Sequence, residues 1–131
     1  MTGTYGSEES ALSGGGIGID LIEISRIEGA LERRPGLAQR LFQPGELRYA
    51  RERARPARHL AARFAAKEAA VKALGAGSIP LREVEVVAGE PPTLRLHGKA
   101  AAAAEARGLE LRVSLTHSRE LAAAVVHADA H

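Results

Sequence analysis

The clearest hydrophobic pattern lies between Arg63 and Gly75, where apolar residues recur with the 3.6-residue period of an α-helix. Alanine, the best helix former, is the commonest residue there, and Gly75 stands where a helix-ending glycine is expected. On a helical projection the large apolar residues share one side: Leu60, Phe64, Val71 and Leu74. The opposite side holds only alanines: Ala62, Ala65, Ala66, Ala69, Ala70 and Ala73. We therefore predict a central helix whose alanine side packs closely against another element.

The charged residues of this helix do not lie opposite its large apolar side, as they would in an ordinary surface helix. We expect Lys67 and Glu68 to project among the large apolar residues, with Arg63 and Lys72 beside them. A partly buried carboxylate needs a cation, a metal or several hydrogen-bond donors, or it loses its charge. The spacing allows a salt bridge between Glu68 and Lys72, one helical turn apart. It also allows a site in which Glu68 binds a divalent cation while Lys67 and Lys72 contact phosphate.

Residues 16–24 alternate with a period of two, which predicts a β-strand. Ile17, Ile19 and Leu21 share one face of this strand, and Gly18, Asp20 and Ile22 share the other. Glycine in a strand allows another backbone or a ligand to approach closely. Asp20 is unusual, because aspartate is disfavoured in strands and no basic residue is adjacent to it. It is either the carboxylate of a turn at the end of the strand or a second acidic ligand for a cation.

The rest of the chain predicts further helices and strands joined by short connections. Helices are expected over residues 25–34, 37–41, 44–53 and 98–107, the first opened by a capping box from Ser25 to Glu28. Strands are expected over residues 82–88, 93–97, 109–117 and 121–127. This order predicts an α+β fold, with a mainly antiparallel sheet packed with a long central helix. Residues 1–15 are expected to be a flexible extension, followed by a single domain of residues 16–131.

Composition narrows the chemistry that the protein can perform. The chain of 131 residues contains no cysteine, which excludes disulfides, thiolate metal sites and a cysteine nucleophile. Charged residues make up 26% and apolar residues 45%, as in ordinary globular domains. No segment reaches the length of a transmembrane helix, and the N-terminus lacks the pattern of a signal peptide. We therefore expect a cytoplasmic protein without a membrane partner.

The net charge of +2 conceals an uneven distribution, because arginine is concentrated in residues 26–63. Such a basic region suggests an acidic partner, either a nucleic acid or an acidic protein surface, or it serves only the solubility of an arginine-rich protein. Aromatic residues make up only 3% of the chain. Since proteins that bind single strands use aromatic side chains to stack the bases, we expect no nucleic-acid partner.

Three of these segments together resemble a known family. They are GIGIDLIEISRI at residues 16–27, RFAAKEAAVKALG at residues 63–75 and VSLTHSRELAAAVV at residues 113–126. In this order, and in a chain of this length, they resemble the holo-acyl-carrier-protein synthases, the small class of phosphopantetheinyl transferases. The resemblance covers residues 16–128. A strand aspartate combined with a helical Lys-Glu pair and a lysine four residues further on is specific to this superfamily, whereas each motif alone would be weak.

The resemblance implies transfer of the 4′-phosphopantetheine arm of coenzyme A to a serine of an apo acyl carrier protein. The products would be the holo carrier protein and adenosine 3′,5′-bisphosphate. By motif position, Asp20 and Glu68 would bind Mg²⁺, which prefers hard oxygen ligands. Lys67 and Lys72 would face the diphosphate, with Lys72 stabilising the leaving phosphate. Either a metal-bound water or Glu68 would take the serine proton.

The resemblance also implies how the partners bind. Arg63 and His117 would help to hold the phosphates of the nucleotide. The carrier-binding helix of the family corresponds to residues 25–34, so Arg26 would contact the acidic helix of the carrier protein. Weaker candidates for this role are Arg33, Arg34 and Arg40. Small members of the family form homotrimers with the active site between subunits, so we expect a homotrimer in which His117 and the Asp20–Glu68 pair come from different subunits.

The sequence departs from the family pattern in a few places. Ala62 replaces the usual glycine before the Arg-Phe pair, Leu121 stands where an aromatic residue is common, and the connection after Gly77 is shorter than is typical. None of these departures removes a proposed catalytic group, namely Asp20, Glu68 or Lys72. The alternatives are a module that docks carrier proteins or coenzyme A without turnover, and an arginine-rich nucleic-acid binder.

Overall fold

The computed structural model describes residues 16–130, so the predicted extension at residues 1–15 lies outside the described residues. Its helices are α2 (Ile24–Arg33), α3 (Leu37–Leu41), α4 (Pro44–Arg51), α5 (Pro56–Leu74) and α6 (Gly98–Ala106). Its strands are β1 (Ile17–Glu23), β2 (Val84–Val87), β3 (Thr93–Leu96), β4 (Leu109–His117) and β5 (Leu121–Ala130), and a 3₁₀ turn, η1 (Leu81–Glu83), precedes β2. These elements confirm the predicted α+β class.

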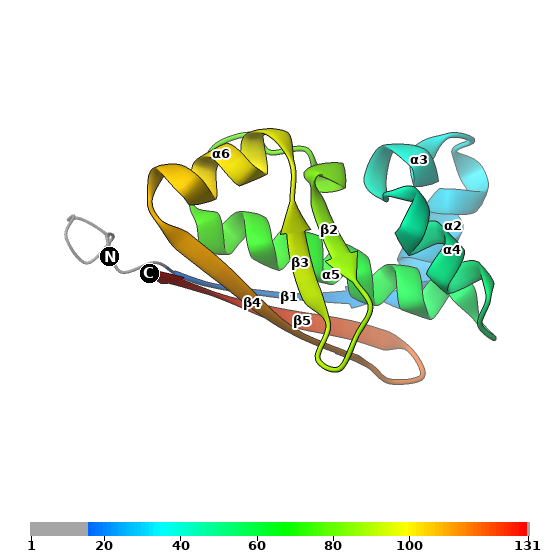
Figure 1. Cartoon of the computed structure of the whole chain (residues 1–131). Helices are drawn as coiled ribbons and strands as arrows, with labels where there is room; N and C mark the ends of the chain where they lie inside the picture. The colour runs from blue at the N-terminus through cyan, green and yellow to red at the C-terminus, as the bar shows by residue number, and fades with distance from the viewer. Residues whose placement is uncertain (1–15, 131) are drawn as a thin grey trace.

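All strand pairs within residues 16–130 are antiparallel, as predicted. One sheet has the order β1-β5-β4, and β2 and β3 form a separate hairpin (Figure 1). In the first sheet Asp20 lies opposite Ala124 on β5, and His117 lies opposite Ala122. The N-terminal strand and the two C-terminal strands therefore form one surface, although most of the chain separates them.

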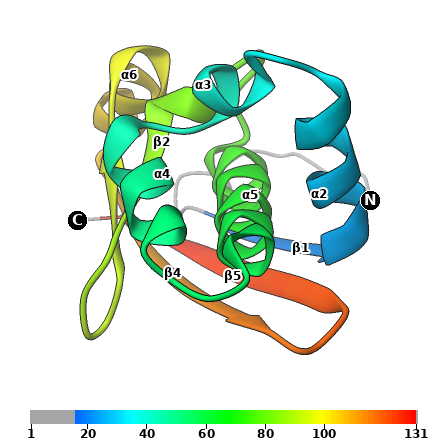
Figure 2. The same cartoon turned by 90° about the vertical axis from the view of Figure 1, so that its right-hand side faces the viewer.

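Helix α5 is the central helix of the fold and packs across one face of the three-stranded sheet (Figures 1 and 2). The helices α2, α3 and α4 surround its N-terminal half, while α6 and the β2–β3 hairpin cover its C-terminal half (Figure 1). The core follows this division. One apolar cluster joins α5 to β2, α6 and β5, and a second joins it to α2 and α4. Residues that face α5 therefore decide both the packing and the sites described below.

The alanine side of α5 packs on the sheet, as the sequence predicted. Five of its alanines are 0% exposed and Ala73 is 3% exposed. Gly18 on β1 faces this side, and a Cβ added there would lie 1.8 Å from the carbonyl oxygen of Ala69. The small residues on both elements thus let the backbones of β1 and α5 approach closely.

Several local features differ from the predictions. Arg82 and Glu83, predicted to begin a strand, lie in the 3₁₀ turn η1, and α4 ends at Arg51. The capping box at Ser25 is not formed, because α2 begins at Ile24 with Glu23 as its N-cap. Helix α5 begins at Pro56, well before the predicted start at Arg63, because proline is favoured in the first turn of a helix. Although α5 has 19 residues, no helix within residues 16–130 combines the length and apolar character needed to cross a membrane.

Lys67 is part of the core. It is 0% exposed, and its Nζ donates to Oε1 of Glu46 at 2.8 Å and to the carbonyl oxygens of Leu81 and Val84. The Glu46 carboxylate also accepts hydrogen bonds from the backbone N–H groups of Gln43 and Val86. This buried ion pair joins α4, α5 and β2.

The prediction that Lys67 faces the diphosphate is therefore wrong in this structure. Successive residues of a helix point about 100° apart, so Lys67 turns toward α4 and β2 while Glu68 turns toward α2. Burial lowers the pKa of Lys67, and the Glu46 carboxylate opposes this shift. The Lys67 ammonium group donates to three buried acceptors and is not exposed, so it cannot contact a ligand.

The contact between β1 and α5 predicts that Gly18→Ala destabilises the protein by about 1–3 kcal/mol, because the added methyl group overlaps the helix backbone. Urea unfolding measures the change. The matched control is Gly77→Ala, since a Cβ at Gly77 meets no atom within 4 Å. Equal unfolding midpoints for the two variants would contradict the close packing.

The buried ion pair predicts that Lys67→Ala lowers the free energy of unfolding by about 3–5 kcal/mol, because Glu46 is left buried without its cation. Lys72→Ala is the control, since the Lys72 side chain is 54% exposed and its loss should cost about 1 kcal/mol or less. If Lys67→Ala unfolds at the wild-type denaturant concentration and only binds phosphate ligands less tightly, the core role of Lys67 is wrong.

Candidate active site

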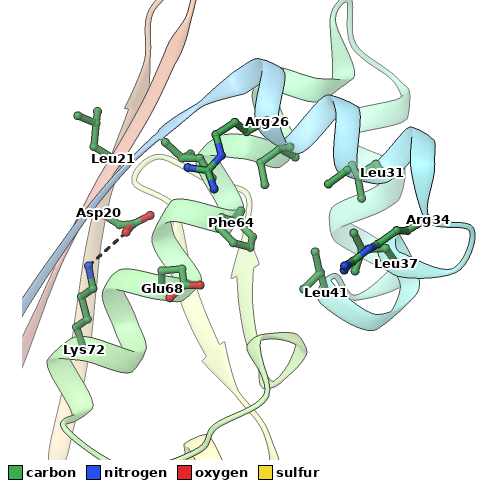
Figure 3. A pocket seen from close by; sticks show the side chains of 13 residues that line it. Asp20, Leu21, Arg26, Leu31, Arg34, Leu37, Leu41, Phe64, Glu68 and Lys72 are labelled. Atoms are coloured by element: carbon green, nitrogen blue, oxygen red, sulfur yellow. Dashed lines mark hydrogen bonds and ion pairs between the residues drawn. The ribbon is translucent and has the colours of Figure 1, made fainter.

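A cavity of about 540 Å³ lies between β1, α2, α3 and α5 (Figure 3). Its wall toward α3 is apolar and is formed by Ile27, Ala30, Leu31, Leu37, Leu41 and Phe64. Its end toward β1 is charged and is formed by Asp20, Arg26, Glu68 and Lys72, and Arg34 lines the cavity just beyond the end of α2. The cavity therefore offers a polar end for charged chemistry and an apolar wall beside it.

Asp20 reaches this cavity from β1, because its position alternates with the outward-facing Ile19 and Leu21. The Asp20 side chain is 19% exposed, and its Oδ1 lies 3.3 Å from Nζ of Lys72. Figure 3 shows this contact, and the same Nζ also donates to the carbonyl oxygen of Ile19 at 3.0 Å. The lysine of α5 is thus held against β1 at the charged end of the cavity.

Glu68 enters the same end of the cavity from α5, one helical turn before Lys72 (Figure 3). Burial raises the pKa of Glu68, the nearby Asp20 carboxylate raises it further, and Lys72 opposes both effects. The two carboxylates are therefore near enough to repel each other. Lys72 forms its ion pair with Asp20. The salt bridge between Glu68 and Lys72, which the sequence spacing allowed, is therefore replaced by a pair between α5 and β1.

Two converging carboxylates can hold a divalent cation. Within residues 16–130 no group of three or more His, Cys, Asp or Glu side chains is placed to bind a metal. A cation bound by Asp20 and Glu68 would therefore complete its shell with oxygens of water or of a ligand. Mg²⁺ is commonly bound in this way, through one or two carboxylates and the phosphates of a substrate.

The predicted carrier-binding arginines divide into two groups. Arg26 on α2 and Arg34, directly after this helix, line the cavity (Figure 3). Arg33 and Arg40 are exposed and do not line it. A partner that lies along α2 would therefore meet Arg26 and Arg34 at the mouth of the cavity.

Arg63 and His117 lie at a second cavity of about 330 Å³, which shares no lining residue with the first. Arg63 comes from α5, and His117 comes from the end of β4. Within one chain, these two residues therefore lie apart from Asp20, Glu68 and Lys72.

The second cavity also contains two residues that the sequence did not single out, Tyr49 and His59. The His59 ring lies edge-on to the rings of Tyr49 and His117, at centroid distances of 5.7 and 5.3 Å. The Arg63 guanidinium lies 4.0 Å from the centre of the Tyr49 ring. His59 precedes Arg63 by four residues and so shares its side of a helix, but nothing in the sequence indicated that β4 ends beside them.

Comparison with known proteins bears on the function of these cavities. The family model of the 4′-phosphopantetheinyl transferase superfamily matches residues 16–126. The holo-[acyl-carrier-protein] synthase of Clavibacter michiganensis subsp. michiganensis is 46% identical over 115 residues, covering 85% of this chain and 92% of the relative. That of Streptomyces coelicolor is 48% identical over 118 residues, covering 87% of this chain and 96% of the relative.

Solved structures give the same result. The complex of Chronobacterium ammoniagenes ACPS with CoA has a TM-score of 0.78 and 30% sequence identity, and the match covers 88% of this chain and 97% of that chain. The family model spans both cavities, including Asp20, Glu68 and His117. The chain therefore belongs to the 4′-phosphopantetheinyl transferase superfamily and, within it, to the holo-acyl-carrier-protein synthases.

Proposed function

We propose that this protein transfers the 4′-phosphopantetheine group of coenzyme A to a serine of an apo acyl carrier protein. The products are the holo carrier protein and adenosine 3′,5′-bisphosphate. The observation that carries the proposal is the convergence of Asp20, Glu68 and Lys72 at one end of a cavity. Relatives that cover most of the chain are named holo-[acyl-carrier-protein] synthases, and one solved relative is a complex with CoA.

In this proposal Asp20 and Glu68 hold Mg²⁺. The raised pKa of Glu68 supports the assignment, because a cation between the two carboxylates would relieve their repulsion. The donor set also fits, since it offers hard oxygens and leaves positions for phosphate oxygens. Mg²⁺, when bound, offsets the negative charge of the diphosphate during transfer.

Lys72 is proposed to stabilise the leaving phosphate. Its ammonium group has three protons, and in this structure Asp20 and the Ile19 carbonyl accept hydrogen bonds from it. Because the side chain is 54% exposed, a further donor direction remains available to a phosphate oxygen. Lys72 thus differs from the buried Lys67, although both were predicted to face the diphosphate.

The transfer forms a bond between the serine oxygen and the phosphorus that carries pantetheine. It breaks the bond from that phosphorus to the oxygen shared with the adenosine half, which leaves as the bisphosphate. The serine proton must pass to a base, and the Glu68 carboxylate lies at the same end of the cavity as Asp20 and Lys72. The protein therefore contributes mainly alignment and charge, as in other phosphoryl transfers.

The carrier protein is proposed to dock along α2, with Arg26 as its principal contact. Arg26 is exposed and also lines the cavity, so a carrier held there would present its serine to Asp20 and Glu68. Arg34 lines the cavity directly after α2, and the exposed Arg33 and Arg40 would add positive charge near the docked carrier. A row of arginines favours association with an acidic partner.

We further propose that the outer face of the three-stranded sheet forms a homotrimer interface. Ile17, Ile19 and Leu21 are 70%, 67% and 64% exposed, and Leu121 and Val125 on β5 are also exposed. The strand register places Ile19 opposite Val125, so these residues form one apolar surface. Such a surface on a small protein indicates an interaction site. In a trimer, Arg63 and His117 of one subunit would complete the Asp20–Glu68 cavity of its neighbour.

The acidic pair is tested by weighing a carrier protein after incubation with enzyme, coenzyme A and Mg²⁺. Asp20→Ala and Glu68→Gln should each slow transfer by on the order of 100-fold or more. Folding raises the pKa of Glu68, so its ionised form disfavours the folded state at neutral pH. Glu68→Gln should therefore be at least as stable as the wild type while it loses activity.

Glu105→Gln is the matched control, because Glu105 is exposed on α6 and lines neither cavity. Near-normal turnover by Asp20→Ala or Glu68→Gln would contradict the metal assignment. If the wild-type enzyme binds several apo carriers but never increases their mass, the protein is a docking module instead of a transferase.

The trimer is tested by Ile19→Asp, which places a charge in the centre of the apolar surface. Light scattering should give the mass of a trimer for the wild type and of a monomer for the variant, with transfer reduced at least tenfold because each site would lose its second half. Ala102→Asp on the exposed side of α6 is the control and should remain trimeric. A monomeric wild type with full activity would rule out the proposed interface.

A further inference from the structure

A polar cluster lies on the outer face of the three-stranded sheet, at the end of the apolar surface proposed above as the trimer interface. His127 is on β5, the middle strand of this sheet (Figure 1). The strand register places it opposite Ile17 on β1 and Arg112 on β4. Val125, which belongs to the apolar surface, precedes it by two positions and so shares its face. An imidazole therefore continues the row of exposed apolar residues along the middle of the face.

The His127 ring is held by a neighbouring carboxylate. Its Nδ1 lies 3.1 Å from Oδ1 of Asp129, the next residue of β5 on the same face. The other carboxylate oxygen, Oδ2, accepts a hydrogen bond from Nη2 of Arg112 at 3.2 Å. Because an ionised carboxylate only accepts hydrogen bonds, Nδ1 carries a proton in this contact. Nε2 of the neutral ring therefore keeps its lone pair, and the His127 side chain is 53% exposed in one chain.

The charges around His127 favour a cation. The charged outer-face groups beside it are Arg112 and Glu110 on β4 and Asp129 on β5, because the register pairs Glu110 with Asp129. β1 contributes only the uncharged Ile17 at this level. Two carboxylates against one guanidinium leave a net negative charge around each neutral imidazole. A cation that met several copies of this cluster would be attracted by each of them.

Three-fold symmetry would bring three such clusters together. This step rests on the trimer proposed above, in which the outer faces of three sheets meet around one axis. The middle strand of each face lies nearest to an axis that the three faces surround, so β5 directs Val125 and His127 toward it. Symmetry places the three His127 rings at one level along the axis. Burial there would remove water from three Nε2 atoms, and a buried acceptor without a partner is costly.

We propose that the three His127 imidazoles of the trimer bind one divalent transition-metal ion of the Zn²⁺ type on the three-fold axis. Zn²⁺ is bound in some proteins by three imidazole nitrogens and one water in a tetrahedral arrangement. Nε2 of each ring would be the ligand. Asp129 would orient the ring through Nδ1, as carboxylates do behind many metal-binding histidines, and Arg112 holds that carboxylate in turn.

This site differs in chemistry from the pair of Asp20 and Glu68. Carboxylates offer hard oxygens, which suit Mg²⁺, whereas imidazole nitrogens suit Zn²⁺ and its neighbours among the transition metals. Within residues 16–130 of one chain, no group of three or more His, Cys, Asp or Glu side chains is placed to bind a metal. The His127 site is therefore incomplete without the partner subunits. Its metal would take no part in phosphopantetheine transfer and would instead hold three subunits together.

Zn²⁺ is the probe that tests the site. Calorimetric titration of the full-length, chelator-treated protein, with Mg²⁺ present to occupy the carboxylate pair, should give one Zn²⁺ per trimer. Light scattering at several protein concentrations measures the equilibrium between monomer and trimer. At a free Zn²⁺ concentration about 100 times its Kd, this equilibrium should shift about 100-fold toward the trimer, because the metal binds only the assembled state.

Four variants separate the site from adventitious metal binding. His127→Asn should stay a folded trimer, but it should bind no Zn²⁺ at one ion per trimer and lose the shift. Asp129→Asn should weaken Zn²⁺ binding by about 10- to 100-fold, because the ring loses its orienting carboxylate. Ile19→Asp keeps His127 but should lose the site together with the trimer. His97→Asn is the control, since His97 contacts Glu85 on β2, and it should bind Zn²⁺ as the wild type does.

The outcomes distinguish this site from the proposed function. A trimer that transfers phosphopantetheine but binds no Zn²⁺ at one ion per trimer, or binds it equally well as His127→Asn, overturns the metal site and retains the function. A wild type that is monomeric with and without Zn²⁺ rejects the trimer interface and the metal site together. One Zn²⁺ per trimer, lost in His127→Asn, in a protein that never modifies a carrier would support the metal site and reject the proposed activity.

Discussion

The close approach of β1 to α5 is the constraint on which the rest of the structure depends. Gly18 has no room for a Cβ against the Ala69 carbonyl, and the alanine side of α5 leaves the same small space. Two residues after this contact, Asp20 is turned inward and meets Lys72 and Glu68. A larger residue at the contact would move the strand away from the helix and separate the two carboxylates. Core packing and the geometry of the charged site are therefore determined together.

Helix α5 supplies charges to three environments, because it is enclosed on most of its sides. Glu68 and Lys72 face the first cavity, Lys67 is buried with Glu46, and Arg63 faces the second cavity. A charge beside an enclosed helix must find a partner, since an unpaired buried charge is costly. Each environment differs: Lys72 pairs with Asp20 beside Glu68, Lys67 forms a buried ion pair with Glu46, and the Arg63 guanidinium lies against the Tyr49 ring. One helix therefore supplies charged residues to two separate cavities.

Much of the fold was predictable, because local patterns are strong here. The helix over residues 37–41 has the bounds that the sequence predicted, and the alanine side, the β2–β3 hairpin and the late antiparallel strands were also confirmed. Asp20 and Glu68 stood out because a carboxylate is out of place on an apolar strand or among large apolar residues. Lys67 was misplaced because its partner, Glu46, lies on another helix, where no short-range pattern connects the two. Tyr49 and His59 were missed because each is an ordinary surface residue until β4 ends beside them.

The amino-acid pattern alone set the order and type of the elements, the small residues between β1 and α5, and the unusual positions of two acids. These follow from periodicity, side-chain size and the cost of placing charge in apolar surroundings, all of which act over short stretches of chain. The choice of partners came from packing: Lys72 meets Asp20, Lys67 meets Glu46, and Arg63 lies beside His59 and His117. Distances between residues far apart in the sequence depend on how whole elements lie against one another, and no local pattern contains that information.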